Sequence, residues 1–475
     1  MLRFDQHVTF PDALPAIARI LLAFLVILLA IKRRWSLGGA FLMGAILLGL
    51  LFGMPWPSIL LSLAHSLTDA KTVSLGIVVS LILVLSHSME KAGQMQRLLD
   101  RFQGLVVRPR INLVIFPALI GLLPMPGGAI FSAPMVKTLG RNLNMPGSLL
   151  SYINYWFRHI WEYWWPLYPG VLLTTTLADI DLWTFVIFLL PLSSVATLVG
   201  YWPLQSLGKP RQNETGRDES PAGSHKTGDG ELQRTNPATV ALAPEAPPDP
   251  TPPPLLPIFR ELTPIVIVIG LGLGLGAALT PVLTPWQISV TKEIGLIVAL
   301  LIAIGWVWHV NGILPGERRR ILMQRELLHM FAMVAAILMF KGMLEESGAV
   351  TLVSDELLRW RVPLVSIIMI LPFLIGAIVG LTVGFVGTTF PILISLVHSF
   401  GQGHLMLPYL MLGLVCGFLG VLLSPLHLCL LLSNAYFQTN LPALYRLLWA
   451  PCLFLLLATC AYFLVLSSGA VTGWL

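Results

Sequence analysis

Four ionisable residues that lie inside apolar sequence are the strongest candidates for chemistry. Arg158, His159 and Glu162 lie in one tryptophan-rich segment, and His427 lies in the second half of the chain. Arg158 and Glu162 are four residues apart, so on a helix they share a face and can neutralise each other. Ionisable groups inside membrane segments are usually paired and functional. Arg158 is therefore a candidate contact for an anion. The two histidines and the glutamate are candidates for carrying a coupled proton.

Simpler interpretations stand beside these. An ion pair in a belt of interfacial tryptophans also explains Arg158 and Glu162, and a hydrogen-bonded core histidine explains His427. His159 and Glu162 form an HxxE pair that, with His427, can ligate a metal in an intramembrane enzyme. No HExxH motif accompanies the pair, so we expect no metal. The cysteines, which lack CxxC or Cys/His spacing and are interpreted as packing residues, are Cys416, Cys429, Cys452 and Cys460.

The elements that position these residues are predicted to be membrane helices. Of the 475 residues, 56% are hydrophobic and only 11% are charged, which is too apolar for a soluble globular protein. The formal charge of +6 does not indicate nucleic acid, because the basic residues cluster at the ends of apolar segments, where they determine topology. We expect an all-α polytopic membrane protein whose surroundings are a lipid bilayer, with no nucleic-acid partner.

Two stretches rich in glycine and proline interrupt the apolar sequence, Leu123–Pro134 and Leu381–Pro391. Each predicts a broken helix, and broken backbone at membrane depth needs polar partners, so both are candidate binding sites. Glycines permit close approach of a ligand, and hydroxyls suit a carboxylate or Na⁺, although each hydroxyl can equally bond to its own helix. The candidate substrate-binding residues are Pro126, Gly127, Gly128, Ser132, Gly384, Gly387, Thr388 and Thr389.

Apolar segments and their flanking charges predict the topology. Lys32, Arg33 and Arg34 place the first loop inside and the N-terminus outside. Residues 111–141 have basic residues at both ends and predict a hairpin that enters and leaves on the cytoplasmic side. Its arms are about 12 residues, about 18 Å each. The alternative is one long kinked helix. Residues 363–400 predict a second hairpin, entered from outside. Spanning segments are expected near 14–31, 36–53, 72–90, 148–175, 182–203, 262–281, 291–310, 326–346, 404–437 and 447–467.

The chain divides into two halves around a region of different composition. Residues 205–258 are rich in proline, serine, glycine and mixed charge, and predict a disordered cytoplasmic linker. Residues 1–204 and 259–475 are then two transmembrane repeats. The segment from Phe116 to Gly121 matches Leu371–Gly376, and Pro134 matches Pro391 in the same order. With five spanning helices and one re-entrant hairpin in each half, about ten spans in all, the repeats are predicted to be inverted. Both termini then lie outside.

These features are similar to those of a known superfamily. The stretches PMPGGAIFSAP and VGFVGTTFP, with the linker between the halves, resemble the ion transporter superfamily of dicarboxylate, citrate, gluconate and lactate carriers. The likeness is greatest to its prokaryotic integral membrane family of unknown function. The sodium-coupled dicarboxylate members have Ser-Asn-Thr at their hairpin tips. The corresponding places here read Ile130-Phe131-Ser132 and Gly387-Thr388-Thr389, without Asn.

The repeat and the resemblance together predict a secondary active transporter. Two hairpins that meet near the midplane form the type of site where such proteins place substrate, and free N–H groups at helix starts favour an anion. We expect a small organic anion, carboxylate-like, coupled to H⁺ or Na⁺, with no other cofactor, in the cell inner membrane. A homodimer is compatible with the sequence. The alternatives are a cation/proton antiporter, for which Glu162 is the best candidate residue, and the intramembrane metalloenzyme.

Overall fold

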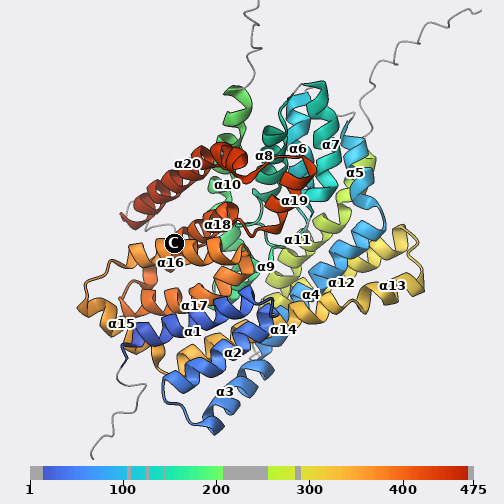
Figure 1. The fold of residues 1–475 in the computed structure, drawn as a ribbon. Helices are drawn as coiled ribbons and strands as arrows, with labels where there is room; N and C mark the ends of the chain where they lie inside the picture. The colour runs from blue at the N-terminus through green and yellow to red at the C-terminus, as the bar shows by residue number, and fades with distance from the viewer. Residues whose placement is uncertain are drawn as a thin grey trace, which may run out of the picture.

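Helices make up the regular structure of the protein throughout its described part. The computed structural model describes residues 14–103, 109–124, 128–143, 145–206, 255–283 and 290–468. Within those ranges every regular element is helical and none is a strand, so the predicted all-α class is confirmed. Figure 1 shows the helices packed into one body, with the two halves of the chain interleaved.

The helices before the linker region are α1 (Ala16–Lys32), α2 (Leu37–Leu51), α3 (Trp56–Thr68), α4 (Ala70–Lys91), α5 (Gln94–Gln103), α6 (Pro109–Gly121), α7 (Ala129–Asn142), α8 (Gly147–His159), α9 (Pro169–Ala178) and α10 (Leu182–Ser206). Those after it are α11 (Leu255–Leu283), α12 (Thr291–Val310), α13 (Pro315–Leu322), α14 (Arg325–Glu346), α15 (Ala349–Arg359), α16 (Leu364–Val379), α17 (Thr382–Ser399), α18 (Met406–Leu423), α19 (Leu428–Tyr436) and α20 (Leu441–Ser467). A short 3₁₀ turn, Gly403–Leu405, precedes α18.

Many of these helices are long and apolar enough to cross a bilayer. Within the described residues there are eight such segments: Ala70–Lys91, Leu182–Leu204, Phe259–Gly276, Thr291–Val310, Pro315–Glu346, Thr382–Ser399, Gly403–Tyr436 and Leu441–Ser467. Shorter apolar helices, including α2, α9 and α16, accompany them. The protein is therefore a multi-pass membrane protein, as its composition predicts.

Several predicted boundaries need correction. The expected span 148–175 is two helices, α8 and α9, and the expected span 404–437 is also two, α18 and α19. Pro166, Pro169 and Pro425 have no N–H to donate, so neither span continues as one helix. The expected loops before α4 and α14 contain the helices α3 and α13. The predicted linker is shorter at both ends, since α10 continues to Ser206 and α11 begins at Leu255. Residues 207–254 lie outside the described part.

The two candidate hairpins are present as packed helix pairs. Helix α6 packs against α7, and α16 packs against α17. A single kinked helix does not fold its two arms against each other, so the arrangement favours the hairpin interpretation. The second break lies at Gly380 and Leu381, and the glycine and threonine motif that follows is inside α17. The motif was expected at the tip itself. The re-entrant course through a bilayer stays a prediction.

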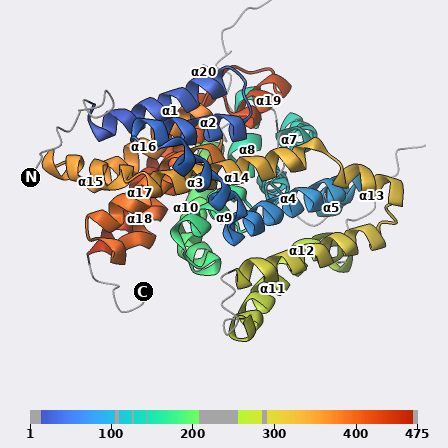
Figure 2. The ribbon, with the colours of Figure 1, turned by 90° about the horizontal axis from the view of Figure 1, so that it is seen from below.

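The order of helices is the same in the two halves, and their packing is reciprocal. Helix α2 packs on α14, and its counterpart α12 packs on α4. The pair α1–α2 and the pair α11–α12 lie on opposite sides of α4 and α14 (Figure 2). Likewise α9 packs on α17 and α19 packs on α7. The inverted relation of the halves across a membrane stays a prediction, but this exchange of contacts brings the breaks of both halves together.

Candidate functional site

Four interrupted helix pairs meet at one place inside the protein. Three contacts join the breaks: the Tyr168 hydroxyl donates to the carbonyl of Gly121 at 2.6 Å, the His427 ring Nδ1 lies 2.9 Å from the carbonyl of Gly380, and Thr382 donates to Glu162. These residues belong to the α6–α7, α8–α9, α16–α17 and α18–α19 breaks. We call the charged, histidine and cysteine side chains gathered there the junction cluster: Arg158, His159, Glu162, His427 and Cys429.

Arg158 is the positive charge of the junction cluster. It lies in the last turn of α8 and is only 3% exposed. Its Nη1 lies 3.5 Å from the Sγ of Cys429 and 3.4 Å from the Nε2 of His159. A Cβ placed on Gly128 would lie 2.4 Å from Nη2 of this guanidinium, so the absence of a side chain at Gly128 leaves room for it. The first hairpin tip and the arginine are therefore in direct contact.

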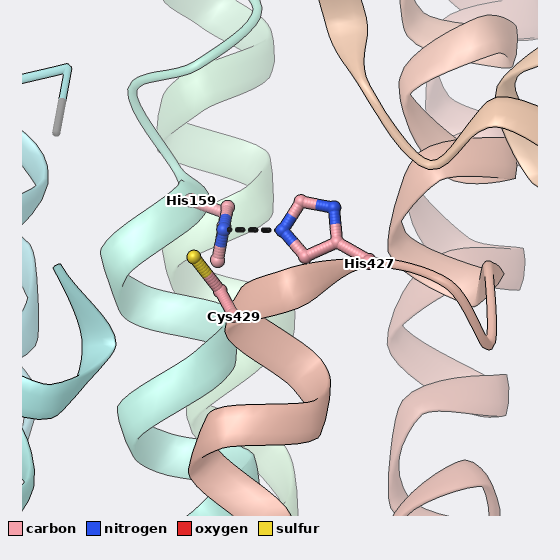
Figure 3. Close-up of side chains that lie close together, drawn as sticks. All are labelled: His159, His427 and Cys429. Atoms are coloured by element: carbon pink, nitrogen blue, oxygen red, sulfur yellow. Dashed lines mark hydrogen bonds between the residues drawn. The ribbon is translucent and has the colours of Figure 1, made fainter. Parts of the chain in front are cut away.

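The two histidines face each other across the two halves of the chain. The Nε2 atoms of His159 and His427 are 3.1 Å apart, and Figure 3 shows the ring of His427 pointing edge-on at His159 from the loop before α19. The other ring nitrogens face backbone carbonyls. His159 Nδ1 lies 2.5 Å from the oxygen of Tyr155, and His427 Nδ1 faces Gly380. Both rings are buried, so these contacts fix their orientations.

Glu162 supplies the negative charge. Helix α8 ends at His159, so Glu162 lies in the turn that follows and not on the same helical face as Arg158. One carboxylate oxygen accepts a hydrogen bond of 2.6 Å from Thr382 at the start of α17. The other lies 3.7 Å from His159 Nε2. Through its hydrogen bond with Thr382, Glu162 of the first half of the chain contacts the N-terminus of α17 in the second hairpin.

The helix ends at the junction are not equally satisfied. Carbonyls at the C-terminal ends of α6, α16 and α18 accept from Tyr168, His427 and Tyr155, the last at 3.0 Å to Leu422. The N-terminal ends of α9, α17 and α19 have no side-chain cap. Uncapped N-termini present N–H groups and a partial positive charge, which favour a bound anion.

Three junction side chains have the donor types of a transition-metal site. The ligand atoms of His159, His427 and Cys429 lie within 4.8 Å of one another, and imidazole with thiolate suits zinc or copper. However, the Arg158 guanidinium is in contact with both Cys429 Sγ and His159 Nε2. A cation held by those atoms would lie against a fixed positive charge, so the donor set fits a metal poorly.

A layer of buried amides and hydroxyls lies beside the junction cluster. Ser132 of α7 donates to Asn154 Oδ1 at 2.6 Å. The amide of Asn154 donates to Ser433 of α19 at 2.8 Å and to the carbonyl of Ala129 at 2.9 Å. Ser151 donates to Asn434 Oδ1 at 2.7 Å. These polar side chains are buried, and they join the first hairpin to α8 and α19.

A comparison with protein families places the chain. The family model described as "Protein of unknown function (DUF401)" matches residues 16–217 and 262–466. The chain belongs to the DUF401 family. No curated protein was found to match it.

The predicted charge candidates of this DUF401 protein lie together. Arg158, His159, Glu162 and His427 all belong to the junction cluster, although the sequence separates the last from the others by more than half of the chain. Gly128 contacts the cluster directly, and Ser132 contacts the polar layer beside it. Pro126 and Gly127 lie outside the described residues.

The second-half candidates have a different environment. Gly384 and Gly387 lie inside α17, where an added Cβ would meet Val379 and Ile337. The Thr388 hydroxyl donates to the carbonyl of Gly384 at 2.8 Å, and Thr389 donates to Phe385 at 2.8 Å. These hydroxyls bond back to their own helix, which is the alternative that the sequence left open. A direct substrate contact for these four residues stays a prediction.

Three residues of the site were not found by sequence reasoning. Cys429 was interpreted as a packing residue, and only its position in the first turn of α19 brings it to Arg158. Asn154 lies four residues before Arg158 on α8, a spacing that identifies the same helical face in the sequence. Thr382 directly follows the Gly380–Leu381 break, and it becomes conspicuous only once that break is correctly placed.

One cavity in the described part of the protein lies away from the junction cluster, at the opposite end of α9. A cavity of about 420 Å³ lies between α4, α9, α11 and α12, and its lining includes the ion pairs Lys71–Asp179 at 2.8 Å and Lys292–Asp181 at 2.7 Å. Asp179 follows the C-terminus of α9, whereas the junction lies at that helix's N-terminus, about 15 Å away. The hydrogen bond from Lys71 lowers the pKa of the Asp179 carboxyl. Paired charges of this kind give the cavity no net attraction for an anion.

Proposed function

We propose that the protein is a secondary active transporter of a small organic anion, which binds at the junction cluster. The observation that carries this proposal is the Arg158 guanidinium, which is buried where both halves of the chain meet. It contacts Cys429 in the first turn of the uncapped helix α19 and lies beside Gly128, directly before α7. A buried charge inside a membrane protein is costly, and such charges are usually paired or functional. Helix N-termini and a guanidinium both favour carboxylate, the first through N–H groups and the second through its paired donors.

The architecture supports movement of the anion across the membrane as well as its binding. Discontinuous helices that meet at the interface of two repeats are typical of secondary transporters, in which one repeat or bundle moves against the other. The resemblance to the ion transporter superfamily supports the same activity and adds H⁺ or Na⁺ as the coupling ion. In this proposal the lipid bilayer is the cell inner membrane, the linker is cytoplasmic and both termini are outside.

The alternatives explain the junction less well. A cation/proton antiporter needs carboxylates that can bind a cation, but Glu162 is the one acidic side chain among the described junction residues and it accepts from Thr382. An intramembrane metalloenzyme needs a metal at His159, where Arg158 lies in contact. Two broken hairpins are also unnecessary for catalysis.

Uptake by the purified protein tests the proposal. Proteoliposomes are given labelled lactate, gluconate, succinate or citrate under imposed pH and Na⁺ gradients. We expect at least one of these anions to accumulate only when a gradient is present. The variant Arg158→Gln removes the positive charge without adding bulk, and we expect it to lose at least tenfold in uptake rate. The matched control is Arg319→Gln, because Arg319 is a surface arginine of α13 and its loss should leave uptake unchanged.

Two results contradict the proposal. One is a folded, reconstituted protein that accumulates none of the four anions under either gradient. The other is an Arg158→Gln variant whose anion uptake equals that of the wild type. Thermal unfolding in detergent, measured on both variants, shows that a loss of uptake in Arg158→Gln is not a loss of folded protein.

A further inference from the structure

We propose that His159 and His427 share one proton between their Nε2 atoms, and that this proton is the coupling ion for the anion. The inference rests on the proposed function, and it replaces the choice of H⁺ or Na⁺ with H⁺. It starts from the backbone contacts of the two rings. A carbonyl oxygen only accepts, so the nitrogens that face Tyr155 and Gly380 must each hold a hydrogen.

The consequence concerns the nitrogens that remain. A neutral imidazole with its hydrogen on Nδ1 has a lone pair on Nε2. Two neutral rings would therefore point two lone pairs at each other across 3.1 Å, which is hydrogen-bond distance with no hydrogen. One added proton turns this repulsion into an N–H···N hydrogen bond. The arrangement therefore favours a pair that carries one proton and one positive charge.

The surroundings indicate which ring is the imidazolium. The guanidinium of Arg158 has only donors, and its Nη1 lies 3.4 Å from Nε2 of His159. This contact is shorter than the 3.7 Å from the same nitrogen to the Glu162 carboxylate, so we assign His159 Nε2 as an acceptor. His427 then holds the proton and donates at both ends, to His159 and to Gly380. Because His427 precedes α19 and His159 ends α8, the proton joins the two halves of the chain. Loss of the proton would remove this link.

The other titratable groups at the pair have assigned partners. On α8, the Tyr155 phenol donates to Leu422, and at the start of α9 the Tyr168 phenol donates to Gly121, so both are neutral. Glu162 accepts from Thr382 of α17, and its other carboxyl oxygen lies 3.7 Å from His159 Nε2. Cys429 of α19 accepts from Arg158, and its thiol is a titratable group that the experiments must separate from the histidine pair.

Counting charges links the proton to the anion. With a neutral thiol, Arg158 and Glu162 cancel, so the junction cluster is neutral when the histidine pair is neutral and has a charge of about +1 when the pair holds its proton. An anion therefore binds more tightly to the protonated pair. By reciprocity, a bound anion tightens the hold on the proton by the same factor. This linkage is what anion/H⁺ symport requires, with one proton for each negative charge that the site compensates.

The first test reads the histidine pair directly and needs no substrate. Protein labelled with ¹⁵N-histidine is reconstituted in lipid nanodiscs, and its nitrogen spectra are compared with those of His427→Gln at pH 5.5 and 8.5. We expect the wild-type spectrum at pH 5.5 to contain one imidazolium signal that is absent from the variant, and one neutral ring, His159, whose Nε2 signal shifts when its hydrogen-bond partner is removed. The matched control is His404→Gln, since His404 is exposed and its loss should leave those signals in place.

The second test reads coupling. Using whichever of lactate, gluconate, succinate or citrate is taken up, the apparent KM is measured between pH 5.5 and 8.5 without Na⁺. Above the pKa of the pair we expect KM to rise by about tenfold per pH unit, the limit for linkage to one proton. His427→Gln should have a flat profile, and His404→Gln should keep the wild-type slope. Cys429→Ser should also keep the slope, whatever its uptake rate.

The outcomes separate this inference from the proposed function. Anion uptake that depends on Na⁺ and is independent of pH overturns the proton inference and leaves anion transport standing. Two neutral rings throughout the pH range overturn it even if no transported anion is found. A slope lost in Cys429→Ser but kept in His427→Gln assigns the proton to the thiol and overturns the inference. So does one bound zinc or copper per chain that is lost in His427→Gln.

Discussion

The two hairpins of this protein use glycine for different purposes. In the first, the residues between α6 and α7 include Gly128, where an added Cβ would meet the Arg158 guanidinium. In the second, the break between α16 and α17 is only Gly380 and Leu381, and Gly380 has a left-handed φ of +68° that closes a tight turn. The glycines beyond that turn, Gly384 and Gly387, are close to aliphatic side chains.

This difference indicates that the hairpin tips of the two halves have different roles at the junction cluster. The first tip contacts the positive charge, whereas the second contributes the Gly380 carbonyl to His427 and the Thr382 hydroxyl to Glu162. The two glycine-containing stretches look equivalent in sequence, but their tips contact different charged and polar groups. With the proposed function, the first tip is expected to determine anion affinity, and the second tip is expected to position the groups that hold the proton and the negative charge.

The largest expected effect comes from adding one methyl group at each hairpin. In Gly128→Ala the new Cβ would lie 2.4 Å from Nη2 and 2.8 Å from Nε of Arg158, so the guanidinium must move. We expect at least a tenfold loss in anion affinity, about 1.4 kcal/mol, with little change in stability because a side-chain end can shift. In Gly384→Ala the Cβ would meet Val379 at 2.5 Å. That overpacking should cost about 1–3 kcal/mol of stability and leave anion affinity within about threefold.

Uptake kinetics and thermal unfolding of the two alanine variants measure both quantities. The comparison fails if Gly384→Ala weakens anion affinity as much as Gly128→Ala does. It also fails if Gly128→Ala unfolds at a much lower temperature than Gly384→Ala, because the first glycine would then have a packing role as well.

Much of the fold follows from composition and spacing, because the physical signals are local. The predicted span 291–310 has the bounds of α12, and the predicted hairpin 363–400 differs by one residue at each end from α16 and α17. Two spans expected to be continuous, 148–175 and 404–437, are instead broken near Pro166 and Pro425, which lack an N–H. In 148–175 the apolar length of the segment predicted a single spanning helix, but its prolines break the segment into two helices.

The site depends on contacts that no local signal contains. The sequence identified Arg158 and His427 because charged groups are rare in apolar segments. It could not place Cys429, since a cysteine in an apolar helix usually packs as a small hydrophobe. It also misplaced the second tip, because a GxxGTT motif appears breakable although α17 accommodates it through the close approach of Ile337. Which glycine serves a ligand and which serves packing is decided by its neighbour in space.

A smaller effect is expected from the threonines of the second hairpin. The variant Thr382→Val removes a hydrogen bond of 2.6 Å to the Glu162 carboxylate, and a bond to a charged group contributes about 1.5–3 kcal/mol. Most of that loss should fall equally on the free and the anion-bound protein, so we expect a three- to tenfold change in anion KM and a shifted pH profile. The control Thr388→Val removes a hydroxyl that bonds to its own helix.

We expect Thr388→Val to change KM by less than twofold. The pH profile is the discriminating measurement, because a purely structural role of Thr382 would lower the amount of folded protein without moving the profile. An unshifted profile in Thr382→Val, or an equal shift in Thr388→Val, would show that the second hairpin does not act through Glu162.

The smallest effect on transport is expected at the polar layer of the first hairpin. Ser132→Ala leaves Asn154 Oδ1 buried without the hydroxyl that donates to it at 2.6 Å. An orphaned buried acceptor costs about 1–3 kcal/mol, which should appear as a lower unfolding temperature. Anion KM should change by less than threefold, because the amide of Asn154 still bonds to Ser433 and to Ala129 and holds the helix start in place. Ser132→Thr, which keeps the hydroxyl, serves as the rescue variant. If Ser132→Ala instead loses transport at unchanged stability and Ser132→Thr restores it, the serine contacts the anion itself, and the binding region extends from Arg158 along α7 into the polar layer.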